Sequence, residues 1–196
     1  MRLILMLAVL VVVALPARAA EALFAGGCFW CMESEFEGHK GVSDVTSGYA
    51  GGKTPNPTYE QVSHGDTGYK ETIRVTYDPA KVSYQDLLEI YWSNVDPMDA
   101  TGQFCDKGDQ YKPAIFAQTE EQEQLAEESK AKMEKHFGQT LAVQILPAAT
   151  FYPAEDYHQD YYKKNSWRYN MYRQGCGRDK RLEQVWGPDA GGHGHP

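Results

Sequence analysis

Residues 26–33 read Gly-Gly-Cys-Phe-Trp-Cys-Met-Glu. The two glycines permit a tight turn, and the residues after them contain neither glycine nor proline, which predicts a helix over 29–37. Cys28 then lies at the helix N-terminus, where unpaired N–H groups and the helix dipole favour a thiolate. Cys31 lies one turn further on, within reach of a disulfide. The spacing is typical of a redox-active pair, and a small buried core cysteine is the alternative.

The first 19 residues (1–19) have the pattern of a secretory signal peptide. Arg2 precedes an unbroken apolar run over 3–15, and Ala-Arg-Ala at 17–19 forms a cleavage site. The run is too short to span a membrane, and no longer apolar run follows it. We therefore expect an exported protein, periplasmic or secreted, whose mature chain begins at Ala20 and contains no membrane span.

The 177 residues that remain are enough for one domain with its own core. Residues 1–19 contain two arginines and no acidic residue, so their removal changes the formal net charge from −8 to −10. This acidity disfavours nucleic acid and anionic lipid as partners. We predict a single catalytic domain over 20–186 and a disordered Gly-, Pro- and His-rich tail over 187–196. Nothing in the sequence requires more than a monomer.

Hydrophobic periodicity predicts strands and helices without a regular βαβ alternation, which favours an α+β fold with a mixed sheet. The expected elements in chain order are a strand over 42–47, a loop over 53–69, a strand over 71–77, a helix capped by Ser83 that runs to 94, a loop over 98–111, a strand over 113–117, a helix from Thr119 to 138, a strand over 141–145, a helix over 154–164 and a short helix over 180–186.

Glu71 has an unusual place on the predicted strand. It shares the strand face of Ile73, Val75 and Tyr77, which is otherwise apolar. A carboxyl group at such a position is either paired or kept protonated by desolvation. If the strand frays before Glu71, the side chain is solvated instead. The pattern alone leaves both interpretations open.

Four cysteines, Cys28, Cys31, Cys105 and Cys176, lie after the predicted signal peptide. Two structural disulfides are one explanation in an exported protein. A Cys28–Cys31 bridge closes too small a loop to stabilise much, so redox chemistry explains that pair better. A zinc site is disfavoured because the cysteines do not form two close pairs, and we predict no metal. A cysteine hydrolase needs a histidine base, and we expect His158 to be structural rather than a base.

The stretch around Cys28 resembles the GCFW motif of the A-class peptide methionine sulfoxide reductases. The resemblance covers about residues 22–165, and the tail around Cys176 resembles one branch of the family more loosely. Further matching segments occur in the family's order: Ser-Gly-Tyr at 47–49, Asn-Pro-Thr-Tyr at 56–59, Gly-Asp-Thr-Gly at 65–68 followed by Glu71, Tyr-Asp-Pro at 77–79, Asp-Pro at 96–97, Gln-Tyr at 110–111, Phe-Tyr-Pro-Ala-Glu at 151–155 and Tyr-His-Gln at 157–159.

The resemblance implies a two-layer αβ roll with long loops over the active site. It implies an enzyme that reduces methionine S-sulfoxide, free or in proteins, to methionine. Cys28 matches the nucleophile that attacks the sulfoxide sulfur, and Glu71 matches the acid that protonates the sulfoxide oxygen. Tyr59 and Tyr111 match phenols that hydrogen-bond the same oxygen, and Asp106 matches an aspartate near the site.

The resemblance also implies an aromatic substrate pocket and a recycling path. Phe29 and Trp30 match the residues around the substrate's S-methyl group, which large apolar rings suit. The family binds no cofactor and is reset through a disulfide by an external thioredoxin-type dithiol. Many members have glycine where Cys31 stands, and the family's histidine two residues before the acid is replaced by Tyr69.

We rank Cys31 first as the thiol that resolves the oxidised Cys28. Cys176 follows as a second-stage relay in a tail without strong structure, where mobility would give it access. Cys105 ranks last because the charge of Asp106 raises its pKa and slows its attack. The alternatives are a general envelope thiol–disulfide oxidoreductase and a disulfide-stapled binding module.

Overall fold

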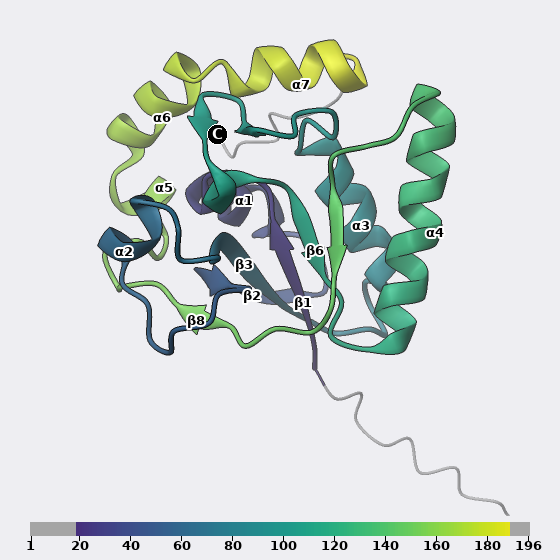
Figure 1. Ribbon diagram of the computed structural model, residues 1–196, viewed down its shortest axis with the longest axis horizontal. Helices are drawn as coiled ribbons and strands as arrows, with labels where there is room; N and C mark the ends of the chain where they lie inside the picture. Colours follow the sequence, from purple (N-terminus) through teal and green to yellow (C-terminus); the bar gives the residue numbers. More distant parts are fainter. Residues whose placement is uncertain (1–18, 189–196) are drawn as a thin grey trace, which may run out of the picture.

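Ala20–Ala25 (β1) forms the middle of a six-stranded sheet in the computed structural model, which describes residues 19–188 (Figure 1). The strand order is β7-β6-β1-β3-β2-β8, and neighbours are antiparallel except for the parallel pair β6 and β7. Gly102–Gln103 (β4) and Asp106–Lys107 (β5) pair separately. The other strands of the large sheet are Val42–Ala50 (β2), Lys70–Tyr77 (β3), Ala114–Phe116 (β6), Gln144–Leu146 (β7) and Tyr152–Pro153 (β8).

Helices complete the second layer. Helix α1 packs against β2, β3 and α3, and α3 in turn packs against α4 (Figure 1). The helices are Phe29–Phe36 (α1), Tyr59–Ser63 (α2), Tyr84–Ser93 (α3), Glu120–Phe137 (α4), Tyr161–Lys164 (α5), Ser166–Gly175 (α6) and Arg178–Trp186 (α7), with a 3-10 turn at Asp109–Tyr111 (η1). The arrangement confirms the predicted α+β class and its mixed sheet.

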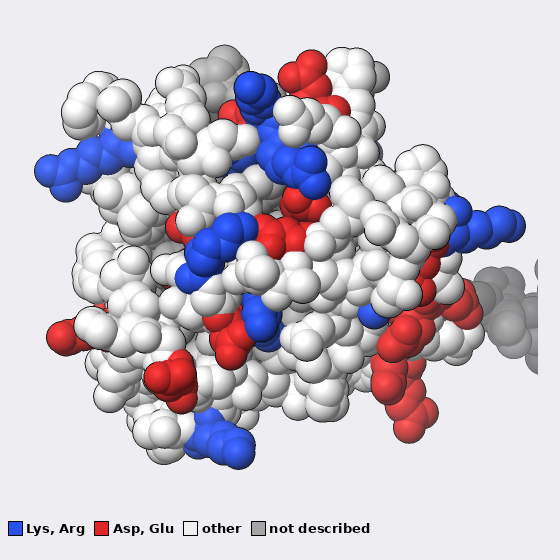
Figure 2. All heavy atoms as spheres, turned by 45° about the horizontal axis from the view of Figure 1, so that its top comes forward, with Lys and Arg blue, Asp and Glu red and all other residues white. Residues whose placement is uncertain are grey.

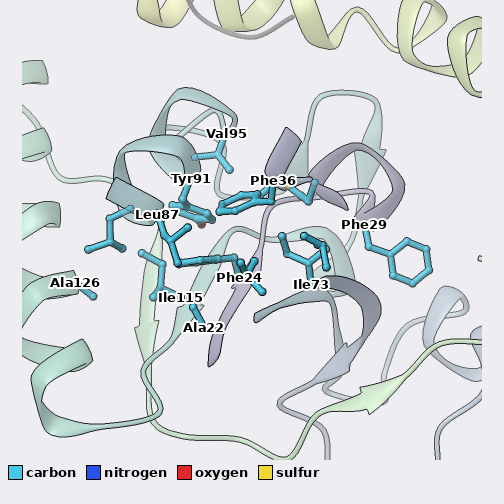
Figure 3. Packing of buried hydrophobic residues seen from close by; sticks show 14 of the residues in the cluster. Ala22, Phe24, Phe29, Phe36, Ile73, Leu87, Tyr91, Val95, Ile115 and Ala126 are labelled. Carbon is cyan, nitrogen blue, oxygen red and sulfur yellow. The ribbon is translucent and has the colours of Figure 1, made fainter. Parts of the chain in front are cut away.

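The main core lies between the sheet and these helices. Because side chains alternate along a strand, Phe24 of β1 faces the helices while Leu23 faces the other side. The Phe24 ring stacks with Phe36 of α1 and Tyr91 of α3, each at 5.2 Å between ring centroids (Figure 3). The smaller cluster around Leu23 is covered by the segment 146–151. The central strand thus joins both clusters and carries the chain directly into α1.

Two predicted helix starts are confirmed by their hydrogen bonds. The Ser83 hydroxyl accepts from the Asp86 backbone N–H at 3.1 Å, and the Asp86 carboxylate accepts from the Ser83 N–H at 2.8 Å, which completes a capping box. Thr119 accepts from the Gln122 backbone N–H at 3.1 Å at the start of α4. These caps depend on residues three apart, so the local sequence is sufficient to predict them.

The predicted helix over 154–164 is largely wrong, because only Tyr161–Lys164 is helical. The Ala154 N–H donates to the carbonyl of Ser47 on β2, so the segment first continues the pairing begun by β8. Asp160 then adopts a φ of +52°, a left-handed conformation that interrupts a right-handed helix. A long-range strand contact and one local turn override the helical pattern.

Other boundaries differ as well. The expected loop over 53–69 contains α2, whose first turn is closed by a capping box between Thr58 and Gln61. Strand β2 continues through Gly48 to Ala50, and a Cβ at Gly48 would lie 2.4 Å from the Phe151 ring. The absence of a side chain therefore permits close packing of Phe151 over the strand at this point.

The C-terminal part is more ordered than predicted, since α6 and α7 cover 166–186 almost continuously. Residues 1–18 of the predicted signal peptide (1–19) and residues 189–196 of the predicted tail (187–196) lie outside the described residues. Among residues 19–188, no helix is long and apolar enough to cross a membrane.

Candidate active site

The glycine turn places Cys28 between the central strand and α1. Gly27 has a φ of +84°, and a Cβ at this position would lie 2.6 Å from the Cβ of Gln103. Both observations explain why the turn needs glycine. Cys28 is the N-cap residue of α1, as the sequence predicts, and its carbonyl accepts the first backbone hydrogen bonds of the helix.

Glu71 lies beneath this helix start. The Phe29 N–H donates to Glu71 Oε2 at 3.0 Å, and the Glu71 side chain is only 3% exposed. The buried interpretation of Glu71 is therefore correct and the solvated one is wrong. Burial raises the pKa of Glu71 to about 8, and the charge of Asp106 adds to the rise against the opposing hydrogen bond from Phe29. Near pH 7 the site thus contains a protonated carboxyl group that can donate a proton.

The two cysteines of the turn are free, buried and hydrogen-bonded to each other. Burial raises the pKa of the Cys28 thiol well above its usual range, and the hydrogen bond to Cys31 and the charge of Glu71 act in the same direction. The place at the helix start favours a lowered thiol pKa at Cys28, whereas in this state burial raises it. The hydrogen bond from Cys28 and the charges of Arg178 and Arg173 lower the pKa of Cys31 to about 7.

Aromatic rings form the wall beside the cysteine pair. Phe29 is buried and lies 5.0 Å from the His158 ring, and the Trp30 indole stacks on Tyr161 at 3.8 Å between centroids. Trp30 Nε1 donates to His158 Nδ1 at 3.0 Å. Burial lowers the pKa of His158 to about 4, so the imidazole is neutral and orients Trp30. His158 is structural, as expected, which removes the base that a cysteine hydrolase would need at this position.

Tyr59 and Tyr111 approach the same place from α2 and η1. The Tyr59 backbone N–H donates to Glu155 Oε1 at 2.9 Å, which anchors the start of α2. Burial and then the charge of Glu71 raise the pKa of Tyr59 to about 12 and raise the pKa of Tyr111. Cys28 also contributes to both shifts, so both phenols lie near the Cys28–Glu71 pair and remain neutral hydrogen-bond donors.

Asp106 of β5 faces the C-terminal helices. The Tyr172 hydroxyl of α6 donates to Asp106 Oδ2, and burial raises the pKa of this carboxyl group. Cys105, the residue before Asp106, forms a disulfide with Cys176 at the end of α6, with 5.0 Å between the two Cα atoms. This bond joins the β4–β5 loop to the C-terminal helices.

The predicted site residues fall into two groups. The sequence predicts that Cys176 lies in a tail without strong structure, and this is wrong. Cys176 is the C-cap residue of α6 and is bonded to Cys105. The eight residues that the fold brings together around the start of α1 are Cys28, Phe29, Trp30, Cys31, Tyr59, Glu71, Asp106 and Tyr111.

Sequence reasoning missed the contribution of α6 and α7 to this site. Arg178 is buried, and its guanidinium donates to the Asn94 carbonyl at 2.6 Å and lies 4.5 Å from the Phe104 ring centroid. Tyr169, Tyr172 and Arg173 recur at three- and four-residue spacing, which places them on one helix face. That spacing is the signal that could have indicated a functional helix.

Figure 2 shows basic side chains scattered over this face of the molecule, whereas several acidic side chains adjoin one another at its lower right.

Residues 20–190 match the family model described as peptide methionine sulfoxide reductase. The peptide methionine sulfoxide reductase MsrA 2 of Caulobacter vibrioides is 54% identical over 177 residues, covering 88% of this chain and 90% of the relative. Mxr1 from Saccharomyces cerevisiae in reduced form matches with a TM-score of 0.72 at 29% identity, covering 77% of this chain and 88% of Mxr1. Mxr1 in complex with Trx2 matches with a TM-score of 0.54 at 21% identity over 77% of this chain and 90% of that one, a likeness in fold.

Proposed function

Because the chain belongs to the peptide methionine sulfoxide reductase family, it is an oxidoreductase that reduces methionine sulfoxide, and we propose that Cys28 and Glu71 perform the reduction. The observation that carries this assignment is the hydrogen bond from Phe29 N–H to Glu71. It holds a buried, protonated carboxyl group beside the thiol at the start of α1.

In the first step the Cys28 sulfur attacks the sulfoxide sulfur while Glu71 transfers a proton to the oxygen. The sulfur–oxygen bond of the substrate then breaks and the oxygen passes to the Cys28 sulfur, while the bond between the two sulfurs breaks with its electron pair on the departing methionine. Cys28 is left as a sulfenic acid, and methionine is released. The proton of the Cys28 thiol needs an acceptor, and the hydrogen bond to Cys31 supplies one. Tyr59 and Tyr111 donate hydrogen bonds to the sulfoxide oxygen, because raised pKa values keep both phenols protonated.

Phe29 and Trp30 bind the S-methyl group of the substrate. Their rings adjoin the Cys28–Glu71 pair, and apolar rings contact a methyl thioether favourably. The fixed directions of methyl pocket, nucleophile and acid select one sulfoxide epimer, which by family resemblance is the S epimer. The substrates are free and protein-bound methionine sulfoxide, and the biological role is repair of oxidised proteins.

In the recycling step Cys31 attacks the Cys28 sulfenic acid and forms a Cys28–Cys31 disulfide. Cys31 is adjacent and free, whereas Cys176 is held by Cys105. A thioredoxin-type dithiol then reduces the bridge, in line with the solved complex of the related Mxr1 with Trx2. The thiols supply the electrons, so the cycle requires no bound cofactor.

The compartment of this reaction is the cell envelope. The signal-peptide pattern over 1–19 supports export, and a Cys105–Cys176 disulfide fits an oxidising environment. Fractionation of cells that express the full chain tests this: processed protein should appear outside the cytoplasm, and unprocessed protein confined to the cytoplasm contradicts export.

The activity test uses residues 20–196 with dithiothreitol and racemic methionine sulfoxide. Consumption of the S epimer alone is expected, and Cys28→Ser should abolish it because the nucleophile is lost. Failure to consume either epimer contradicts the proposal, and consumption of the R epimer alone contradicts its stereochemistry. Reduction of insulin disulfides without sulfoxide turnover would identify a general thiol–disulfide oxidoreductase instead.

A further inference from the structure

Tyr169 on α6 is the polar residue that covers Cys31 from the side of the C-terminal helices. The two residues and Cys28 form one small buried cluster, in which Tyr169 is 6% exposed and Cys31 is 1% exposed. The Tyr169 side chain hydrogen-bonds the Cys31 sulfur. Its hydroxyl also lies 2.7 Å from Ser34 Oγ, which donates to the Cys31 carbonyl at 2.8 Å. The hydroxyl is therefore held beside the sulfur by two elements, α1 and α6.

Arg173, one turn along α6, determines which way the Tyr169 hydroxyl points. Arg173 Nη1 donates to the Tyr169 oxygen at 2.9 Å, so the single phenolic proton is directed away from Arg173, to the side where Ser34 Oγ and the Cys31 sulfur lie. The guanidinium is itself fixed by Glu35 and Asp179, each with 2.6 Å between nitrogen and oxygen. Burial raises the pKa of Tyr169, so it remains a donor while Cys31 ionises.

We propose that Tyr169, oriented by Arg173, is a positioning residue that stabilises the Cys31 thiolate for its attack on the oxidised Cys28. The inference rests on the proposed function of Cys28 and Cys31. In this step the Cys31 sulfur forms a bond to the Cys28 sulfur, and the sulfur–oxygen bond of the sulfenic acid breaks. Hydroxide leaves and takes up a proton to become water. Tyr169 loses its thiolate acceptor when the disulfide forms, so its hydrogen bond favours the thiolate and not the product.

The test measures the two steps separately in Tyr169→Phe. Enzyme without reductant receives one equivalent of methionine sulfoxide between pH 5.5 and 10, and samples are quenched over time. Methionine released reports the first step, and mass spectrometry of the Cys28–Cys31 bridge reports the second. In the wild type the second rate should rise with pH as the Cys31 thiol ionises, and the midpoint of that rise is the reference for the variants.

Loss of the hydrogen bond should move this midpoint upward by about one pH unit. A thiolate of higher pKa is also a stronger nucleophile, so the variant should be roughly threefold slower below the midpoint and faster by a similar factor at high pH. The two pH profiles therefore cross. A rate reduced by the same factor at every pH, or an unchanged midpoint, would overturn the proposal, because a packing role alone produces no crossing.

Tyr84→Phe is the matched control. Tyr84 is also 6% exposed, and its hydroxyl has no hydrogen-bond partner among the described residues, so its removal should leave the midpoint unchanged. If Tyr169→Phe fails to fold, Arg173→Lys carries the test, since it removes the guanidinium hydrogen bond and should raise the midpoint by a smaller amount.

The proposed function can fail independently of the role of Tyr169. Absence of methionine release in the wild type contradicts the function itself. If Cys31→Ser releases methionine and Cys28 still forms a disulfide with another cysteine, Cys31 is not the resolving thiol. That result would also overturn the proposal for Tyr169. Release at the wild-type rate with a shifted second step in Tyr169→Phe supports both.

Discussion

Replacing Glu71 by glutamine should change the shape of the pH profile of the first catalytic step. In the wild type the first proton to leave the Cys28–Glu71 pair does so near pH 8, mainly from Glu71, and the second leaves at higher pH, mainly from Cys28. The reactive form retains one proton, on Glu71, with Cys28 as thiolate. The rate should therefore rise toward pH 8 and fall once the second proton is lost.

In Glu71→Gln the side chain at position 71 no longer titrates, so the rate should rise to a plateau as the cysteine pair ionises, with no decline at high pH. The removed negative charge also lowers the pKa of Cys28, because Glu71 contributes to its rise. An amide cannot transfer a proton to the sulfoxide oxygen as an acid does, and general acid catalysis contributes about 10²–10⁴-fold. At pH 8 the variant should be slower by this factor, which corresponds to about 3–5 kcal/mol of activation free energy.

Single-turnover quenched-flow measurements with enzyme in excess, from pH 6 to 10.5, give the rate of methionine formation. Glu33→Gln is the matched control, since burial raises the pKa of Glu33 to about 7 while its carboxylate bonds Ser47 and Asp160 away from the thiol. It should retain the wild-type profile. If Glu71→Gln reacts at the wild-type rate or keeps the decline at high pH, Glu71 is not the acid, and Tyr59 or Tyr111 becomes the candidate.

Three further predictions concern stability. Burial raises the pKa of Glu71 from 4.5 to about 8, so the folded state binds its proton more tightly, and the resulting stabilisation is complete below pH 4.5 and is lost as the pH rises to 8. Urea unfolding should show a loss between pH 5 and pH 8 that is about 3.5 kcal/mol larger for wild type than for Glu71→Gln, and equal losses would contradict this sign. Gly27→Ala should lower the free energy of unfolding by about 1–3 kcal/mol, because φ is +84° and the new methyl meets Gln103; a neutral effect in urea would show that the turn relaxes. Joint replacement of Cys105 and Cys176 by alanine should cost up to about 4 kcal/mol, since the bond closes a loop with a sequence separation of 71, while one methionine per enzyme is still released; loss of that first turnover would place the disulfide in the chemistry.

Features that depend on neighbours in sequence were predictable. The capping box at Ser83 and Asp86 requires residues three apart. The alternation of its own strand places Glu71 on the apolar face, although it leaves open whether the side chain is buried. Cys28 at the start of α1 follows from two glycines and the residues after them. The resemblance then supplied Tyr59 and Tyr111, which the fold brings to the same place.

Features that depend on distant contacts were not predictable. Helix α6 lacks a side-chain cap, and its ten residues include Ser, Trp, Asn and two Tyr, which are modest helix formers, so its helicity depends on packing against α1 and α5. The pairing of Cys105 with Cys176 needs that helix in place. The high pKa of Cys28 likewise follows from burial by the C-terminal helices. The sequence around the helix start does not indicate this long-range contact.

Strand β1 also determines how the enzyme can be tethered. Its six residues enter the sheet at Ala20 and end immediately before the turn that bears Cys28, so the two ends are about 20 Å apart. Figure 1 shows Ala20–Ala25 running from the lower rim of the sheet toward α1. A bead, a fluorescent protein or a membrane anchor attached ahead of Ala20 is therefore joined to the edge of the sheet that is remote from Cys28. The edge that carries Cys28 then faces away from the attachment, where an oxidised protein substrate can reach it.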